Sequence, residues 1–290
     1  MKSDFSIGVI GNGFVGQAIA NAFALNMPVL VYDKNPKKSI NLLREVIQDS
    51  KVIFLCLPTP MNMSENNKID LSIIESCLQE ISSLKINLRE KVFVVKSTVV
   101  PGTTQSLKSK FKNMRIVFNP EFLTERTANL DFINATRIVI GGESKDLGVV
   151  EALFRERFPH KKIIKTDDKT SEFIKYMCNC FFATKVSFMN EMFQMSEILD
   201  LDWDKVLDGF VSDGRIGNSH LNVPGHDGHK GFGGKCFPKD INAIINFYLE
   251  KKLKPTVLSA VWKKNLEVRN SRDWEKIEGA ISNNRKGEIK

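Results

Sequence analysis

The run FSIGVI at residues 5–10 passes directly into the glycine-rich stretch GNGFVG at residues 11–16, and small and apolar residues follow. This is the order of a strand, a tight turn and a helix, with the glycines spaced as G-x-G-x-x-G. Gly11 permits the tight turn, Gly13 lets the backbone approach a pyrophosphate, and Gly16 lets helix and strand pack closely. We therefore expect a dinucleotide to bind here, with its phosphates at the helix N-terminus.

A second apolar run, at residues 29–32, ends at Asp33. A carboxylate at this place accepts hydrogen bonds from the adenosine ribose hydroxyls and repels a 2′-phosphate, which favours NAD over NADP as the cofactor. Lysines at positions 34, 37 and 38 follow closely and weaken this preference. The cofactor-binding residues predicted in this region are Gly11, Gly13, Phe14, Val15, Gly16, Asp33 and Lys38.

Short β-branched runs alternate with amphipathic stretches over roughly the first 165 residues. The candidate strands are residues 5–10, 29–32, 52–57, 92–95, 116–118 and 138–140. This alternation predicts an α/β fold, with a Rossmann-type, doubly wound parallel sheet. Ligands of such sheets bind beyond the carboxyl ends of the strands, so Thr59 and Thr98, which follow two of these runs, join the predicted cofactor-binding residues.

The second part of the chain is predicted to be a mostly helical central and dimerisation domain. Residues 171–199 contain no Pro or Gly, and their apolar side chains occupy most of the circumference of a helix. This pattern is typical of a buried helix, either a spine between domains or a dimer seam. We expect an NAD-binding domain at 1–165, a helical domain at 166–270 and a polar tail at 271–290. The polar stretch after Asn265 is expected to fray.

Composition and charge exclude several classes of protein. The 290 residues are 42% hydrophobic and 26% charged, as in a globular protein with a full core. No apolar run approaches the roughly 20 residues of a membrane helix, and the N-terminus passes into a strand rather than a signal peptide. We expect a cytoplasmic protein that does not bind membranes. Aromatic residues do not interleave with the basic residues near the C-terminus, so no nucleic-acid partner is expected.

One of the five cysteines lies in a setting typical of a nucleophile. The stretch GFGGKCFPKD, residues 231–240, places Cys236 after a glycine turn and at the entrance to a helix. A helix N-terminus and the neighbouring Lys235 and Lys239 favour the thiolate. A buried structural thiol is the alternative interpretation. The cysteines form no C-x-x-C pair, so we expect free thiols in a reducing compartment.

Two polar side chains interrupt the apolar helix. Lys175 and Asn179 are four residues apart and therefore project from one face. A buried lysine is costly unless it is paired, which indicates a functional role, although a lysine that extends to solvent is common. His220, His226 and His229 precede Cys236, but no convincing set of further ligands accompanies them, and we predict no metal site.

Four motifs together resemble the UDP-glucose/GDP-mannose dehydrogenase family. They occur in the family's order within roughly residues 5–270, and they are GFGGKCFPKD, the Lys175-x-x-x-Asn179 helix that continues to FMNE at 188–191, KSTVVPG at 96–102 and NPEFLTE at 119–125. The resemblance implies a four-electron oxidation, in which C6 of a nucleotide-linked hexose is converted from alcohol through aldehyde to acid with two NAD⁺. Cys236 would form a thiohemiacetal and then a thioester, which water hydrolyses.

The resemblance also implies roles for the matched residues. Lys175 and Asn179 would stabilise the developing oxyanion, and Asp240 would hold or activate water with Thr98. Glu121 would be the general base of the hydrolysis. The predicted catalytic residues are Cys236, Lys175, Asn179, Asp240, Thr98 and Glu121.

Further residues are assigned to ligands by the same resemblance. Glu125 would contact the nicotinamide end of NAD. Arg215 would reach the sugar bound in a neighbouring subunit, which implies a homodimer formed through the helix at 171–199. The predicted substrate-binding residues are Glu121, Phe122, Leu123, Lys175, Asn179, Arg215 and Gly233.

The chain departs from the family pattern in two places. It stops before the usual third, C-terminal domain, which helps to grip the nucleotide, and the stretch between Asp33 and the next strand is short. Two alternatives follow. One is a two-electron dehydrogenase of the 3-hydroxyacid or 6-phosphogluconate type, which needs no cysteine. The other is a truncated, non-catalytic NAD-binding partner of another subunit.

Overall fold

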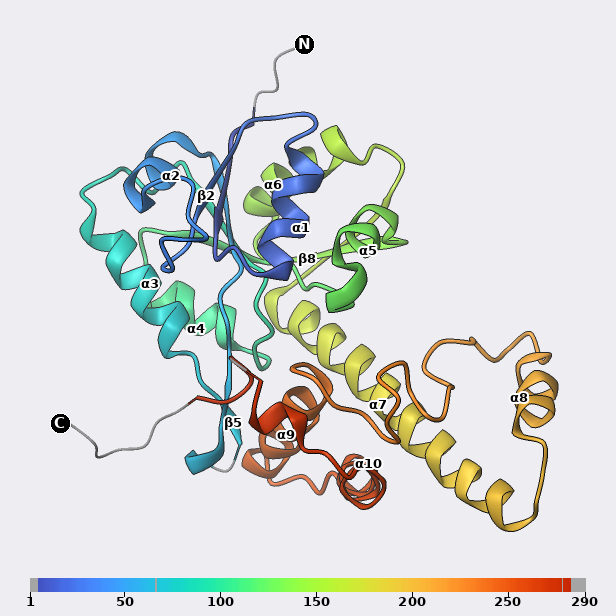
Figure 1. The fold of residues 1–290 in the computed structure, drawn as a ribbon. Helices are drawn as coiled ribbons and strands as arrows, with labels where there is room; N and C mark the ends of the chain where they lie inside the picture. The colour runs from blue at the N-terminus through green and yellow to red at the C-terminus, as the bar shows by residue number, and fades with distance from the viewer. Residues whose placement is uncertain (1–4, 66, 278, 283–290) are drawn as a thin grey trace. The chain divides into compact units, whose positions relative to one another are not determined.

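The computed structural model describes residues 5–65, 67–277 and 279–282, which form two compact units (Figure 1). The first unit comprises Met1–Thr59 and Leu71–Lys175, and the second comprises Pro60–Asp70 and Tyr176–Lys290. The strands are β1 (Ile7–Ile10), β2 (Val29–Tyr32), β3 (Val52–Leu55), β4 (Met61–Asn62), β5 (Lys68–Ile69), β6 (Val92–Val95), β7 (Arg115–Phe118), β8 (Arg137–Gly141) and β9 (Lys162–Thr166).

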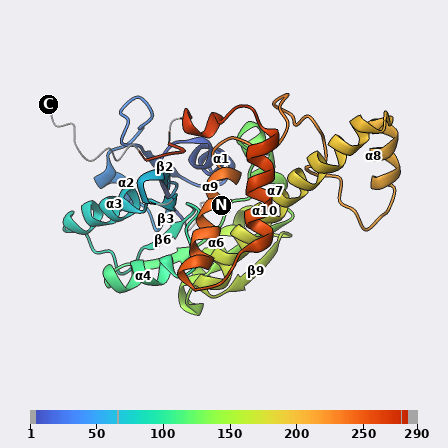
Figure 2. The same ribbon diagram turned by 90° about the horizontal axis from the view of Figure 1, so that it is seen from below.

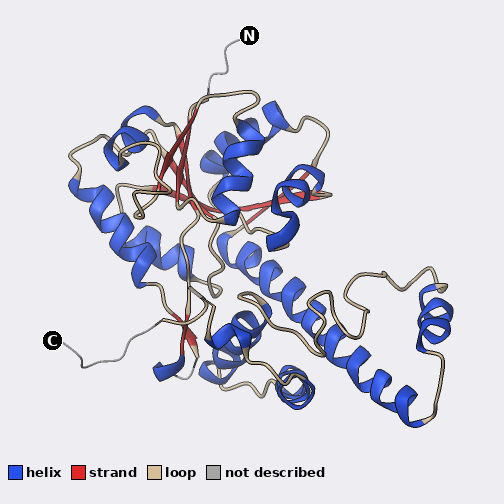
Figure 3. Cartoon of the chain, in the orientation of Figure 1, coloured by secondary structure: helices blue, strands red, loops and turns tan. Residues whose placement is uncertain are grey.

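Helices account for much of both units (Figure 3). The α-helices are α1 (Phe14–Phe23), α2 (Leu43–Asp49), α3 (Ser72–Ser83), α4 (Thr103–Lys110), α5 (Ala128–Asn134), α6 (Ser144–Arg157), α7 (Asp168–Ile198), α8 (Trp203–Val211), α9 (Phe237–Glu250) and α10 (Thr256–Val268). The short 3₁₀ helices are η1 (Met63–Glu65), η2 (Glu125–Thr127) and η3 (Asp273–Glu275). Among the described residues, no helix has both the length and the apolar character needed to cross a bilayer.

The first unit is built on a sheet whose order in the described residues is β2-β1-β3-β6-β7-β8-β9. Neighbouring strands are parallel except for β7 and β8, which meet antiparallel at Phe118 and Gly141. The order reverses direction at β1, where the chain leaves the sheet on one side for β2 and returns on the other for β3. This arrangement confirms the predicted doubly wound, Rossmann-type fold. The sequence analysis did not identify β9 or the β4–β5 hairpin.

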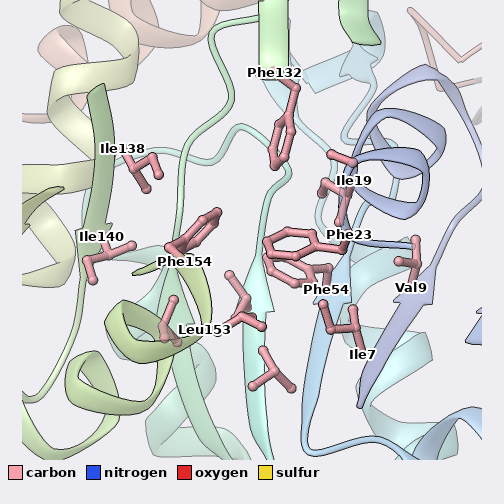
Figure 4. Packing of buried hydrophobic residues seen from close by; sticks show 14 of the residues in the cluster. Ile7, Val9, Ile19, Phe23, Phe54, Phe132, Ile138, Ile140, Leu153 and Phe154 are labelled. Carbon is pink, nitrogen blue, oxygen red and sulfur yellow. The ribbon is translucent and has the colours of Figure 1, made fainter. Parts of the chain in front are cut away.

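Alternate residues of each strand face opposite layers of helices, because side chains on a strand point to opposite faces. Val52 and Phe54 of β3 pack against α1, α5 and α6, whereas Ile53 and Leu55 pack against α2, α3 and α4. Figure 4 shows the first of these layers, in which the rings of Phe54 and Phe154 lie around Phe23 at centroid distances of 5.9 and 5.6 Å. Burial on both faces explains why the strands have continuous apolar sequences.

In the second unit, α9 packs on α10, as Figures 1 and 2 show. Helix α8 folds against the C-terminal half of α7, where Trp203 lies edge-on to Phe193 at 5.2 Å. The hairpin β4–β5 belongs to this unit and pairs with the segment near Ile281. The expected fraying after Asn265 is wrong for the described residues, since Val268, Trp274 and Ala280 are buried.

Helix α7 is only partly covered by the chain itself. The sequence predicted a helix buried all round, and the structure corrects this, because a row of large apolar side chains is exposed. Within the part of the chain that the structure describes, other elements pack against one side of α7, and the other side is exposed. The exposed residues of the row within the second unit are Met177, Phe181, Phe188, Met192 and Met195.

Candidate active site

The predicted glycine turn follows β1 and leads into α1. Gly11 has a φ of 95°, which favours glycine, and a Cβ on Gly16 would lie 1.9 Å from the carbonyl oxygen of Gly11. A Cβ on Gly13 would meet nothing within 4 Å, so the turn is open to a ligand there. Helix α1, which begins with Phe14 and Val15, has no capping side chain and no acidic residue in its first turn. These features fit the pyrophosphate of NAD.

Asp33 follows β2 directly and fixes the same turn. Its Oδ2 accepts the N–H of Asn12 at 2.6 Å, and its Oδ1 accepts the N–H of Asn35 at 2.8 Å. The Asn12 side chain in turn donates to the carbonyl oxygen of Lys38 at 2.7 Å. Each carboxylate oxygen can accept more than one hydrogen bond, so Asp33 retains the capacity to bind ribose hydroxyls.

The segments after β3 and β6 are linked to each other. Thr59 Oγ1 donates to the carbonyl oxygen of Thr98 at 2.9 Å, and both threonines are buried. Ser97 Oγ donates to the carbonyl oxygen of Leu57 at 2.6 Å. Two predicted cofactor-binding residues are therefore neighbours at the carboxyl edge of the parallel strands, where ligands of this fold bind.

Glu121 and Lys175 form a buried ion pair within the first unit. Lys175 Nζ lies 2.7 Å from Glu121 Oε1, and their side chains are 3% and 7% exposed. Glu121 Oε2 accepts the N–H of Leu123 at 2.7 Å, and the ring of Phe122 lies 5.6 Å from the Lys175 ammonium. Burial alone raises the pKa of Glu121, but the charge and hydrogen bond of Lys175, the N–H of Leu123 and the charge of Lys96 together hold this pKa below its usual value. Glu121 is thus a carboxylate able to accept a proton.

Lys96 is a third charged residue of this cluster, and the sequence analysis gave it no role. It is buried, and its ammonium donates to Asn119 Oδ1 at 3.0 Å and to the carbonyl oxygen of Pro120 at 3.2 Å. Burial lowers the pKa of Lys96 to about 8. The available signal was a lysine placed directly after the buried strand β6, at the edge where ligands of this fold bind.

In the second unit, Asn179 and Asp240 are joined directly. Asn179 Nδ2 donates to Asp240 Oδ2 at 2.5 Å, and both residues are buried. The ammonium of Lys239 pairs with the other oxygen of Asp240 at 2.5 Å. The positive charge of Lys239, which the sequence analysis assigned to the Cys236 thiolate, is therefore opposed by this carboxylate.

Cys236 is the N-cap residue of α9, and its carbonyl oxygen accepts the N–H of Asp240 at 2.8 Å. Its side chain is half-buried. Three other cysteines are poor nucleophiles, because burial raises the pKa of the Cys56 and Cys77 thiols to about 12 and also raises that of Cys180. The thiol that the motif singled out thus lies at a helix N-terminus, where a thiolate is favoured.

Three further predicted ligand-binding residues lie on a loop or at the start of a short helix. Arg215 is exposed and pairs with Asp213 at 2.5 Å. Glu125 begins η2 and is exposed. Gly233 lies against the guanidinium of Arg269. The described residues contain no group of three or more His, Cys, Asp or Glu side chains able to hold a metal ion.

Comparisons with known proteins follow the same division of the chain. Residues 40–157 match the NAD binding domain of the UDP-glucose/GDP-mannose dehydrogenase family, and residues 169–267 match the central domain of that family. UDP-glucose 6-dehydrogenase of Rickettsia felis is 34% identical over 264 residues, which cover 88% of this chain and 56% of that protein. The chain thus spans a little over half the length of this relative.

Solved structures agree with these matches. A UDP-glucose dehydrogenase from Pyrobaculum islandicum has a TM-score of 0.81 at 26% identity, covering 92% of this chain and 69% of that one. The 3-hydroxyisobutyrate dehydrogenase of Mycobacterium tuberculosis has a TM-score of 0.73 at 16% identity, covering 92% of this chain and 94% of that one, a likeness of fold alone. The matched NAD binding domain confirms the predicted cofactor. The chain belongs to the UDP-glucose/GDP-mannose dehydrogenase family.

Proposed function

We propose that this chain oxidises C6 of a nucleotide-linked hexose, UDP-glucose or a similar UDP- or GDP-sugar, from alcohol to carboxylate. One observation carries the proposal. Cys236 caps α9, and one turn further along the same helix Asp240 is buried and bonded to the amide of Asn179. A thiol, a carboxylate and an amide donor are the groups that covalent oxidation of an aldehyde and hydrolysis of a thioester require.

The residues of the turn between β1 and α1, with Asp33, hold NAD. NAD⁺ would supply the hydride acceptor of each oxidation, so two molecules of NAD⁺ would be used, one after the other, for each acid formed. The sulfur of Cys236 adds to the C6 aldehyde, which gives a thiohemiacetal and later a thioester that water hydrolyses. Because the thiohemiacetal keeps the aldehyde attached to the chain until the second oxidation, no free aldehyde is released.

The remaining groups stabilise charge and transfer protons during the oxidation of the same substrate. Lys175 and Asn179 donate to the C6 oxygen as negative charge develops there. Glu121, which its buried partners keep ionised, accepts a proton from the attacking water. Thr98 and Asp240 hold that water. Phe122, Leu123 and Gly233 contact the substrate.

The assembly we propose is a homodimer formed through α7. The exposed row of apolar side chains contains Phe181, Phe188, Met192 and Met195, whose spacings of seven, four and three residues keep them on one face. An apolar face of this size is uncommon on a monomer and is typical of an interface between like chains. In the dimer, Arg215 of one copy contacts the sugar bound by the other.

The central test is the ratio of NADH to product acid. The purified chain is incubated with NAD⁺ and a panel of UDP- and GDP-sugars, and NADH release and acid formation are both measured. We expect two NADH for each acid, and we expect Cys236→Ser to form no measurable acid. The matched control is Cys178→Ser, which changes another half-buried thiol of the second unit and should retain full turnover.

Other outcomes identify the alternatives. One NADH for each turnover, insensitive to alkylation of thiols, would indicate a two-electron dehydrogenase. A chain that binds NAD but oxidises no nucleotide sugar, even at high protein concentration, would indicate a non-catalytic partner subunit. Undiminished acid formation by Cys236→Ser would remove the covalent mechanism.

A further inference from the structure

The turn that precedes Cys236 is held by side chains from remote parts of the second unit. The N–H of Phe232 donates to Asn265 Oδ1 at 2.6 Å, and the carbonyl oxygen of Phe232 accepts Asn265 Nδ2 at 3.0 Å. The N–H of Gly231 donates to Asn190 Oδ1 at 3.0 Å. Asn265 on α10 and Asn190 on α7 are both buried. The turn therefore takes its backbone partners from two helices.

Arg269, which ends α10, supports the same turn through its charge. Its guanidinium is 1% exposed and contacts Asp227 at 2.8 Å and Asp273 at 3.0 Å. The second oxygen of Asp273 accepts the N–H of Gly234 at 2.8 Å. A Cβ on Gly233 would lie 2.2 Å from Arg269 Nη2, so the close approach of the ion pair explains this glycine.

Stability alone does not explain this arrangement. Arg269 Nη1 is buried and has no hydrogen-bond partner among the described residues. A buried ion cluster with an unsatisfied donor usually stabilises a fold less than apolar packing of the same volume. The cluster instead fixes the position of the turn before Cys236, because its hydrogen bonds and ion pairs connect the turn to several different segments. The turn ends two residues before Cys236.

We propose that Asn265, Arg269 and Asp273 are positioning residues that keep the sulfur of Cys236 at the N-terminus of α9. The proposal rests on the proposed function, in which Cys236 is the nucleophile. The N–H groups in the first turn of a helix favour a thiolate at its N-terminus, so a displaced sulfur ionises less readily at neutral pH. A displacement of about 1 Å also costs on the order of 100-fold in reaction rate.

The test measures the reactivity of the thiol without substrate or NAD. Asp273→Asn is the first variant, because this side chain is 31% exposed and Arg269 keeps its contact with Asp227. Arg269→Lys is the second, since it keeps the charge but not the branched geometry. The matched control is Glu275→Gln, the same kind of change on the same 3₁₀ helix. Alkylation by iodoacetamide is followed at Cys236 and at Cys178 by mass spectrometry of peptides, and circular dichroism checks the fold.

At pH 7 we expect alkylation of Cys236 to be about threefold to tenfold slower in Asp273→Asn than in the wild type. At pH 10 the difference should vanish, because a solvent-accessible thiol is then ionised with or without the help of a helix N-terminus. The rate at Cys178 and all rates in Glu275→Gln should be unchanged. A Cys236 rate in folded Asp273→Asn equal to that of the wild type at pH 7 overturns the proposal, and so does equal slowing at both pH values.

This experiment separates the proposal from the proposed function, because alkylation needs no turnover. If the chain oxidises no sugar but shows the expected alkylation rates, the proposed function is wrong. The positioning role of Asn265, Arg269 and Asp273 is then still supported. In an active chain, Asp273→Asn should lower kcat by a larger factor than it changes KM for the sugar, as expected for a group that acts mainly through Cys236.

Discussion

The two units hold their candidate catalytic groups in different ways. In the first unit Thr98 and Glu121 follow parallel strands, and Lys175 on α7 fixes Glu121 through a buried ion pair. In the second unit they lie on a loop and on the first turn of α9, and amide side chains such as Asn179 and Asn265 fix them through hydrogen bonds. A sheet edge places its side chains through the regular geometry of the strands. A loop needs partners from distant segments.

This difference predicts where a single substitution does most harm. Removing one partner of a buried ion pair leaves an uncompensated charge, which costs about 3–5 kcal/mol. Removing one partner of a hydrogen bond leaves a polar group without a partner, which costs about 1–3 kcal/mol. The first unit should therefore be the more sensitive of the two to loss of a single site residue.

The largest effect is expected for Lys175→Met. This change leaves the Glu121 carboxylate buried without its cation, and we expect the free energy of unfolding to fall by about 3–5 kcal/mol. Urea denaturation followed by circular dichroism measures the loss. The double variant Glu121→Gln with Lys175→Met should recover part of it, because neither position of the pair then holds a buried charge. A loss below about 1 kcal/mol for the single variant would contradict the comparison.

Glu172 extends the comparison, since it is a buried carboxylate of the first unit that pairs with no cation among the described residues. Its oxygens accept the N–H groups of Gly102 and Thr104 at the start of α4, and burial raises its pKa to about 7. An unfolded glutamate ionises near pH 4.5. Between these pH values the folded chain holds the proton that the unfolded chain has lost, so stability falls as the pH rises from about 4.5 to about 7 and is level above.

We expect this group to contribute at most about 3 kcal/mol across that interval. The measurement is the difference in unfolding free energy between the wild type and Glu172→Gln at several pH values, which cancels the titration of other groups. The difference should decline from pH 4.5 to pH 7. A difference that stays level over this range would show that Glu172 ionises at its ordinary pKa.

In the second unit, Asn179→Leu should cost less. Asp240 loses the amide hydrogen bond but keeps the ammonium of Lys239, so we expect a loss of about 1–2 kcal/mol. The control on the same helix is Gln194→Met, where the side chain is half-buried and the change should stay within about 0.5 kcal/mol. If Asn179→Leu destabilises the chain as much as Lys175→Met does, the proposed contrast between the units fails.

The first unit was largely predictable because its signals are local. Runs of β-branched residues identify β1, β3 and β6, and the glycine spacing identifies the turn before α1. Glu121 and Lys175 were both predicted as site residues, but no local pattern pairs two residues so far apart in the sequence. The antiparallel direction of β8 was not predicted either, because apolar periodicity does not encode strand direction.

The residues that hold the turn before Cys236 in the second unit could not be predicted, for a different reason. Arg269 and Asp273 lie in the polar stretch after Asn265 that we expected to fray, and they are instead buried against the turn before Cys236 or bonded to it. The polar residues that form hydrogen bonds to the backbone of a buried loop are of the same types as the residues that face water. Only the tertiary structure distinguishes these two uses.

A substitution on the exposed side of helix α7 should have the smallest effect on the unfolding free energy of the single chain. It should have a large effect on formation of the dimer. An apolar sequence indicates burial, but it does not show whether the same chain or a second copy covers the surface. Phe188→Lys changes a side chain that is 51% exposed, so the unfolding free energy of the single chain should change by no more than about 0.5 kcal/mol. A charge at the centre of the proposed interface should nevertheless separate the dimer.

Light scattering coupled to gel filtration measures this, with Ile40→Lys as the matched control, because Ile40 is an exposed apolar residue of the first unit. The wild type and Ile40→Lys should have the mass of two chains, and Phe188→Lys the mass of one. If the wild type has the mass of one chain at micromolar concentration, the exposed side of α7 faces solvent and the proposed dimer does not form. In that case Arg215 would have no second copy to reach, and the sugar would be bound by residues of one chain alone.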